Sequence, residues 1–148
     1  MDKALDRIFD PLRKKYVKLT PEEAVRQLFI RFLVGQRNFP ESHMASEYVM
    51  ELNGMQRRTD IVVFNRELKP VLIVECKAQS VQLEKSEIAR ETMEQALRYN
   101  SVLGVKVLVI TNARNTFALK LNHMSGNDNG AQFEFLNELP SYDELCGI

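Results

Sequence analysis

The chain has few of the features that mark several classes of protein. It has no tryptophan and only two cysteines, Cys76 and Cys146, which are far apart in sequence. Two such cysteines form neither a disulfide framework nor the paired spacing of a zinc site, so free thiols and a cytoplasmic location are expected. No apolar run approaches the roughly 20 residues that span a bilayer. Residues 1–7 also lack the apolar segment of a signal peptide. We therefore expect no membrane association.

An excess of charge of one sign is also absent. Lysine and arginine total 20, and aspartate and glutamate total 20, so the formal net charge is zero. No global field attracts the protein to nucleic acid or membrane, and any contact with nucleic acid has to come from a local patch. The length of 148 residues predicts a single domain, residues 1–148, large enough for a proper core. Residues 1–19 are interpreted as an N-terminal extension that contains a short helix or turn.

Two amphipathic helices are predicted from the spacing of apolar residues. The first covers residues 21–34: Thr20 can cap its N-terminus, Glu23 completes a capping box, and Gly35 ends it. The second covers residues 87–100 and follows a serine that can cap it. Each helix has one apolar face, so each is expected to pack against other elements.

Apolar runs of strand length account for most of the remaining chain. Strands are predicted over residues 47–52, 57–64, 71–77, 105–111, 116–121 and 132–136, and a terminal helical turn over residues 141–146. The run at 105–111 is almost continuously apolar, so it is expected to be buried on both faces. The predicted fold class is α/β, with a central mixed β-sheet flanked by helices.

The strands at residues 57–64 and 71–77 are joined by a polar link that ends in proline, a pattern that predicts a hairpin. Asp60 lies near the start of the first strand, and Glu75 and Lys77 lie near the end of the second. Antiparallel pairing places the start of one strand beside the end of the next, and residues two apart share a face. These three ionisable groups should therefore lie together, which costs free energy unless they pair or bind a metal.

The three groups suit a magnesium site. Mg²⁺ prefers hard oxygen ligands and is usually held by one or two carboxylates together with water and phosphate. Asp60 and Glu75 could supply the carboxylates and the backbone carbonyl of Cys76 a third oxygen. Lys77 could orient a water molecule or stabilise charge on a phosphate. A plain ion cluster at the strand ends explains the same spacing equally well, so the residues alone leave both interpretations open.

The spacing of Asp60, Glu75 and Lys77 resembles the core motif of the PD-(D/E)XK nuclease superfamily. Four blocks in the same order resemble the N-terminal nuclease domain of type I restriction enzyme R subunits: residues 20–27, 58–63, 74–78 and 95–100. The resemblance implies a restriction-endonuclease-like fold and magnesium-dependent cleavage of DNA phosphodiester bonds, with Mn²⁺ expected to substitute. It implies that the two acids hold the metal and that the lysine assists the nucleophile.

The resemblance adds further candidate site residues. Gln95 and Tyr99 lie four apart on one helix face, as in a branch of these nucleases where the glutamine serves the active site and the pair helps to position DNA. An amphipathic helix with Tyr99 in the core accounts for the same spacing. Glu22 is the candidate metal ligand on the first helix, because Glu23 already serves the capping box, although an acidic first turn suits the helix dipole as well. Arg58 is the candidate phosphate contact.

The resemblance also indicates partners. Full-length family members carry an ATP-driven motor after the nuclease domain, whereas this sequence contains no G-x-x-x-x-G-K-[ST] phosphate loop. The expected partners are DNA and either a separate motor or the subunits of a restriction–modification system. Two alternative functions stay open. One is a structure-selective nuclease similar to a Holliday-junction resolvase, which would act as a homodimer. The other is a catalytically silent domain that binds DNA or a partner protein.

Overall fold

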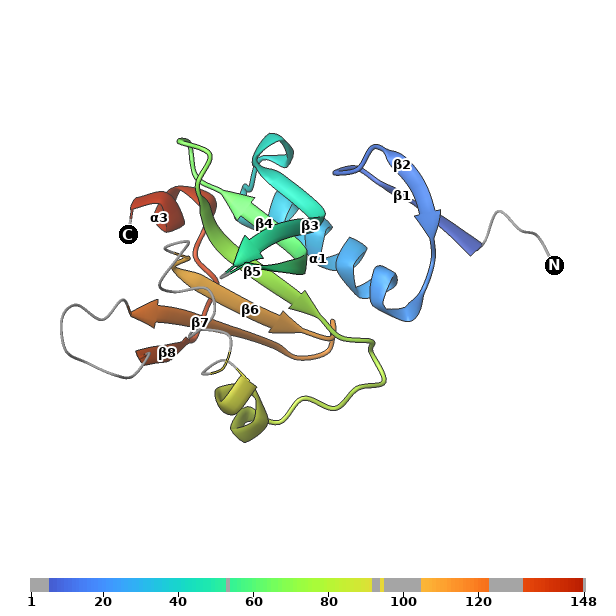
Figure 1. Cartoon of the computed structure of the whole chain (residues 1–148). Helices are drawn as coiled ribbons and strands as arrows, with labels where there is room; N and C mark the ends of the chain where they lie inside the picture. The colour runs from blue at the N-terminus through green and yellow to red at the C-terminus, as the bar shows by residue number, and fades with distance from the viewer. Residues whose placement is uncertain (1–5, 53, 92–93, 95–104, 123–131, 148) are drawn as a thin grey trace.

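A computed structural model describes residues 6–52, 54–91, 94, 105–122 and 132–147. Its centre is a mixed sheet of six strands in the order β3-β4-β5-β6-β7-β8, shown in Figure 1. All neighbouring strands are antiparallel except β5 and β6, which are parallel. The strands are β3 (Met44–Leu52), β4 (Met55–Phe64), β5 (Pro70–Cys76), β6 (Val107–Thr111), β7 (Thr116–Asn122) and β8 (Gln132–Leu136). The predicted α/β class with a central mixed sheet is confirmed.

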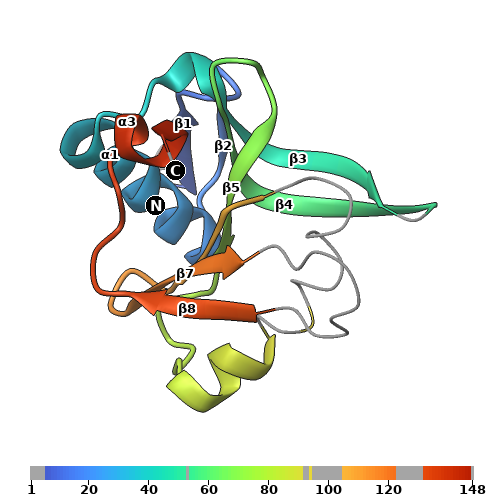
Figure 2. The same ribbon diagram turned by 90° about the vertical axis from the view of Figure 1, so that its left-hand side faces the viewer.

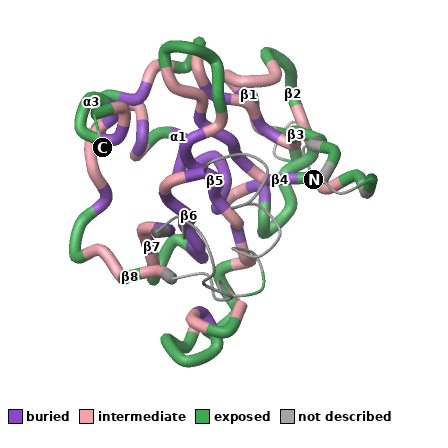
Figure 3. The backbone as a smooth tube through the Cα atoms, turned by 60° about the vertical axis from the view of Figure 1, so that its left-hand side comes forward, coloured by how far each residue is buried: buried purple, intermediate pink, exposed green. Residues whose placement is uncertain are grey.

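Helices cover the two faces of this sheet. Helix α1 (Pro21–Arg37) lies on one face, and the helical residues 85–91 lie on the other, as Figure 2 shows. Alternate residues of β6 serve the two sides: Val109 belongs to the core beneath α1, whereas Ile110 packs with Ile88. Every residue of β6 is buried, so the predicted burial on both faces is confirmed. Figure 3 shows that buried residues are concentrated in α1, β5 and β6.

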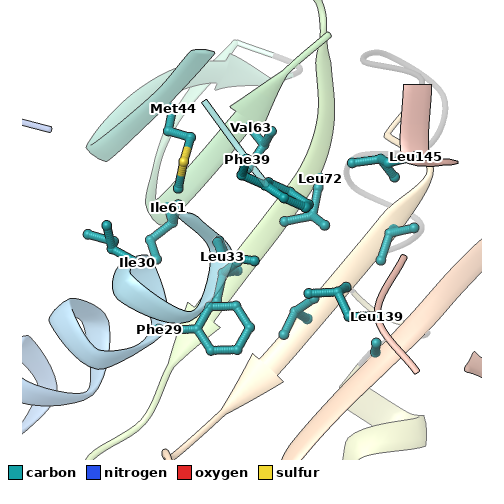
Figure 4. Packing of buried hydrophobic residues seen from close by; sticks show 14 of the residues in the cluster. Phe29, Ile30, Leu33, Phe39, Met44, Ile61, Val63, Leu72, Leu139 and Leu145 are labelled. Atoms are coloured by element: carbon teal, nitrogen blue, oxygen red, sulfur yellow. The ribbon is translucent and has the colours of Figure 1, made fainter. Parts of the chain in front are cut away.

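The core beneath α1 explains why this helix keeps its place. Phe29, Ile30 and Leu33 point from α1 onto Ile61 and Leu72 of the central strands (Figure 4). Leu33 and Leu72 are completely buried. Burying side chains of this size contributes roughly 1.5–3 kcal/mol each, so this contact fixes α1 against β4 and β5. The N-terminal turn of α1 is thereby held beside the β4–β5 hairpin.

The two ends of α1 show one prediction that is right and one that is wrong. The hydroxyl of Thr20 accepts a hydrogen bond of 3.0 Å from the backbone N–H of Glu23, as an N-cap should. The helix does not end at Gly35 but continues to Arg37. Asn38 closes it with φ of 60°, and its N–H donates to the carbonyl of Leu33. A helix needs a left-handed residue at this point, and asparagine tolerates that conformation.

Residues 7–19 contain a turn, at residues 11–14, but no helix, so only the helical alternative of the expected short helix or turn is wrong. They form an antiparallel ribbon of β1 (Arg7–Asp10) and β2 (Lys15–Lys18) beside α1. The four-residue turn between them contains Lys14 in the left-handed region, and the Lys14 N–H donates to the carbonyl of Asp10 at 2.7 Å. The apolar spacing resembles that of a helix, but the turn and cross-strand pairing determine the structure.

Several other boundaries differ by a few residues. Strand β3 starts at Met44, before the predicted start at residue 47, and follows the 3₁₀ turn Glu41–His43. The helical residues on the second face begin at 85, so Ser86 lies inside that helix and does not cap it. The C-terminal helix α3 (Tyr142–Gly147) matches the predicted helical turn. The predicted continuation of the second helix over residues 95–100 lies outside the described residues.

Candidate active site

The β4–β5 hairpin brings Asp60 to the end of β5, as predicted. Ile61 and Val74 are Cα partners in the antiparallel ladder, so Asp60 lies alongside Glu75. The backbone N–H of Cys76 donates a hydrogen bond of 2.7 Å to Oδ2 of Asp60. Because Asp60 is thus tied to the residue between Glu75 and Lys77, the three predicted residues lie near one another at the end of β5.

Asp60 lies in an environment that disfavours its charge. Burial is the largest influence and raises the pKa of Asp60, and the nearby charges of Glu47 and Glu22 raise it further. The hydrogen bond from Cys76 and the charge of Arg26 act in the opposite direction without cancelling the rise in pKa. A carboxylate in such surroundings is stabilised by a further cation, so its position suits a metal ligand.

Arg26 connects Asp60 to two other acids. Its guanidinium lies 3.2 Å from Glu23, 2.7 Å from Glu47 and 3.3 Å from Asp60, and its side chain is only 4% exposed. Nη2 donates to both Glu47 and Asp60, so one nitrogen bridges β3 and β4. Sequence reasoning did not single out this role for Arg26, because its partners on the strands are distant in sequence.

Glu47 is the second residue that sequence reasoning missed. It has φ of 53° in the middle of β3, and the ladder passes over it: Ser46 pairs with Ile61 and Tyr48 with Thr59. Such an irregularity re-aims a side chain in a strand. Burial raises the pKa of Glu47, but the hydrogen bond and charge of Arg26 more than offset this, so the net pKa is lowered. Glu47 is therefore ionised at neutral pH. No sequence signal marks a left-handed glutamate in a strand.

Lys77 follows the last residue of β5 and is held from two sides. Its backbone N–H donates to the carbonyl of Thr111 at 2.8 Å, which continues the parallel pairing of β5 with β6. Its ammonium lies 3.3 Å from the carboxylate of Glu91, on the helix that covers the second face. The lysine side chain is 37% exposed, so it can reach solvent at the sheet edge while this contact restrains it.

Cys76 turns its side chain away from this edge. The thiol packs in the core beneath α1, and burial raises its pKa, with the charge of Asp60 adding to the effect. A thiol with a raised pKa is a poor nucleophile, so these surroundings favour a structural role for this side chain. Glu75, its neighbour, is half-buried and pairs with Ile110 in the parallel ladder.

The other predicted residues differ in their exposure and in their contacts. Glu22, the candidate metal ligand on the first helix, is exposed, and its charge acts on Asp60. Glu23 is buried, and its carboxylate accepts from Arg13, Arg26 and Gln27 instead of closing a capping box. The side chain of Arg58 is 70% exposed, and its guanidinium lies 3.4 Å from Glu47. Gln95 and Tyr99 lie outside the described residues.

The oxygen atoms at this site suit a hard cation, but they would fill only part of its coordination shell. Within the described part of the chain, no three His, Cys, Asp or Glu side chains form a group that could hold a metal ion. Asp60 and Glu75 are two candidate carboxylate ligands, and the backbone carbonyl of Cys76, the residue after Glu75, is a third candidate oxygen. Mg²⁺ is commonly bound by one or two carboxylates while water and phosphate complete its shell. The set of oxygens is thus compatible with magnesium bound together with a phosphate substrate.

A model of the family described as "Type I restriction enzyme R protein N terminus (HSDR_N)" matches residues 21–140. The chain belongs to this family. Among solved structures, it is similar to the fragment structure of a putative HsdR subunit of a type I restriction enzyme from Vibrio vulnificus YJ016. The TM-score is 0.55 and the identity 20%, over 86% of this chain and 24% of that chain. This likeness supports the restriction-endonuclease-like fold predicted from the sequence.

The domain therefore spans about a quarter of the length of that HsdR fragment. No curated protein matches the chain. No helix among the described residues is long and apolar enough to cross a membrane.

Proposed function

We propose that this member of the HSDR_N family is a metal-dependent DNA endonuclease domain that hydrolyses phosphodiester bonds as part of a type I restriction system. The observation that carries the proposal is the β4–β5 hairpin. It ties Asp60 to the backbone of Cys76 at 2.7 Å, which supports a site formed by Asp60, Glu75 and Lys77 at the end of β5. DNA and the other subunits of a restriction–modification system are the proposed partners.

In this proposal Asp60 and Glu75 hold Mg²⁺, or Mn²⁺ in its place, with the backbone carbonyl of Cys76 as a third ligand. When bound, the ion supplies charge to stabilise the phosphate and lowers the pKa of a bound water. Glu22, whose charge raises the pKa of Asp60, is proposed as a further ligand. A site with these oxygens is selective for hard cations.

The chain's own residues then orient the reactants. Lys77 places its ammonium to orient the attacking water or to stabilise charge on the phosphate, and Glu91 restrains the side chain for this task. Arg58 is exposed enough to contact a DNA phosphate. Gln95 is proposed to serve the site and Tyr99 to contact DNA from the second helix.

Arg26 and Cys76 determine how Asp60 presents its carboxylate. Oδ1 accepts from Arg26 at 3.3 Å and Oδ2 accepts from the Cys76 N–H at 2.7 Å. A carboxylate has about four lone-pair positions, so one protein donor on each oxygen leaves the others available to a cation. The orientation of the carboxylate is therefore set before any metal binds.

A catalytically silent domain is the second candidate, and the same arginine supports it. Arg26 already provides a positive charge between Glu47 and Asp60. In a protein that has no need of a metal, this contact would suffice to compensate the two carboxylates. A domain of that kind would bind DNA or a partner protein without cleaving.

Calorimetric titration of Mn²⁺ into wild type and Glu75→Gln, with and without an uncleavable oligonucleotide, tests the proposal. Glu67→Gln in the exposed β4–β5 turn is the matched control. We expect binding to wild type and the control, and its loss in Glu75→Gln. Supercoiled, linear and four-way-junction DNA are then incubated with wild type and Asp60→Ala in Mg²⁺. Full cleavage by Asp60→Ala would refute the assignment, and metal binding without cleavage of any substrate would favour the silent domain.

A further inference from the structure

The N-terminal ribbon presents a face that the fold does not use. Cross-strand pairing joins Phe9 to Tyr16 and Arg7 to Lys18, and alternation along each strand puts all four side chains on one side. We call these four residues the outer face. Phe9 is 46% exposed and Tyr16 67% exposed, and their rings lie edge to face with centroids 5.3 Å apart. Two aromatic rings are thus displayed beside two cations.

The opposite side of the ribbon anchors it to the domain. Asp10 is completely buried and accepts from Arg13 and from the backbone N–H of Leu12, which packs against the core beneath α1. Arg13 also lies 2.7 Å from Glu23, the residue that pairs with Arg26. The ribbon is therefore held next to the candidate active site by its inner side, and Phe9 and Tyr16 on the outer face stay substantially exposed among the described residues.

Charge on the ribbon is strongly one-sided, although the whole chain is neutral. The exposed cations of residues 6–19 are Arg7, Lys14, Lys15 and Lys18. Asp6 is the exposed acid of the same segment, since Asp10 is buried and paired with Arg13. The local patch that a neutral protein needs for contact with nucleic acid is present here. A polyanion is the partner that this charge complements.

We propose that the outer face of the β1–β2 ribbon binds a DNA strand next to the active site, with Arg7, Lys18 and the turn residue Lys14 on phosphates and with Phe9 and Tyr16 stacked on unpaired bases. Cations on the backbone supply affinity, and aromatic rings bind bases of any sequence by stacking. The inference rests on the proposed function and extends its DNA contacts to residues that precede the family match at 21–140.

The test is fluorescence anisotropy of the full chain with a labelled oligothymidine of about 20 nucleotides in EDTA, longer than typical single-strand site sizes of about 4–16 nucleotides. Tyr16→Val, which keeps a strand-forming residue but removes the ring, should weaken binding about 5- to 150-fold, while Tyr16→Phe should bind as wild type. The double variant Lys14→Gln/Lys18→Gln should reduce the slope of log affinity against log salt by about 1.4, or about 0.7 for each phosphate that a lysine no longer neutralises.

The matched control is Leu68→Ala/Lys69→Gln in the β4–β5 turn, where Leu68 is 67% exposed, like Tyr16. It should bind DNA as wild type does. The inference is overturned if the wild type does not bind the oligonucleotide, or if both ribbon variants bind like the control with an unchanged salt slope. The latter result would leave the ribbon as a protein contact. The lysine variant keeps the test valid if Tyr16→Val proves unstable by circular dichroism.

A parallel cleavage assay in Mg²⁺ separates this inference from the proposed function. Asp60→Ala should bind the oligonucleotide normally in EDTA and should not cleave. If the wild type binds through the ribbon but cleaves no DNA, the nuclease proposal fails while the ribbon inference holds. If the wild type cleaves and the ribbon variants bind normally, the ribbon inference fails while the nuclease proposal holds.

Discussion

Replacing Arg26 by methionine removes a buried cation that contacts three carboxylates. Removing one partner of a buried ion pair typically costs about 3–5 kcal/mol, because the remaining charge is left uncompensated. Each acid here keeps another partner: Glu23 keeps Arg13 at 2.7 Å, Glu47 keeps Arg58 at 3.4 Å, and Asp60 keeps the Cys76 N–H. We therefore expect Arg26→Met to lower the free energy of unfolding by about 3 kcal/mol, near the lower end of that range. In a domain of this size, such a change lowers Tm by about 6–12 °C.

The loss should depend on pH in a defined direction. Arg26 lowers the pKa of Glu47 below its ordinary value of 4.5, so the pair stabilises the fold above that pH and the stabilisation is lost as the pH falls through the lowered pKa. The difference between wild type and Arg26→Met should therefore be full at pH 7 and should shrink below about pH 4.5. Protonation of the acids removes the charges that methionine leaves uncompensated.

Urea denaturation of the metal-free protein at pH 7 and in acid measures both effects. Arg31→Met is the matched control, since Arg31 lies on the same helix and is exposed. It should change stability by less than about 0.5 kcal/mol. Equal stability of Arg26→Met and Arg31→Met at pH 7 would refute the reasoning, because it would mean that the buried ion pairs contribute nothing to the folded state.

Three further predictions concern the core, the metal and the thiols. Leu33→Ala should lower the free energy of unfolding, measured by urea denaturation, by about 2–5 kcal/mol because Leu33 is fully buried. Leu28→Ala should lower it far less, because Leu28 is 53% exposed. Equal losses of stability would contradict the packing of α1. Mn²⁺ at about 100 times its Kd should stabilise wild type by about 2.7 kcal/mol and should leave Asp60→Asn unchanged in a thermal-shift assay. A thiol reagent should modify Cys146 well before Cys76, since Cys76 is buried and its pKa is raised; faster labelling of Cys76 would show that the hairpin opens.

Local patterns were enough to predict the hairpin that carries Asp60, Glu75 and Lys77. Two β-branched runs and a polar link ending in proline specify antiparallel neighbours, and alternation then assigns each side chain to a face. The N-terminus of α1 was predictable for the same reason, because the cap Thr20 needs only the backbone N–H of Glu23. These features depend on residues a few positions apart, or on a pairing that the turn itself enforces.

Such local patterns could not predict the contacts between residues that are distant in the sequence. The pairs of Arg26 with Glu47 and with Asp60 join residues 21 and 34 positions apart. Glu47 has its left-handed conformation between two residues that both pair with β4. The parallel pairing of β5 with β6, which fixes the backbone of Lys77, likewise needs the whole crossover to fold.

The N-terminal ribbon shows the same division. Its apolar spacing suited a helix, and only the turn at Lys14 and the anchoring of Asp10 to Arg13 settled it as two strands. By itself the sequence determined the α/β class, the central hairpin and the three residues at its end, since hydrophobic periodicity and turn chemistry act between near neighbours. Tertiary structure alone decided which charges meet Asp60 and which face of the ribbon stays exposed, because burial and ion pairing depend on elements that are distant in the chain.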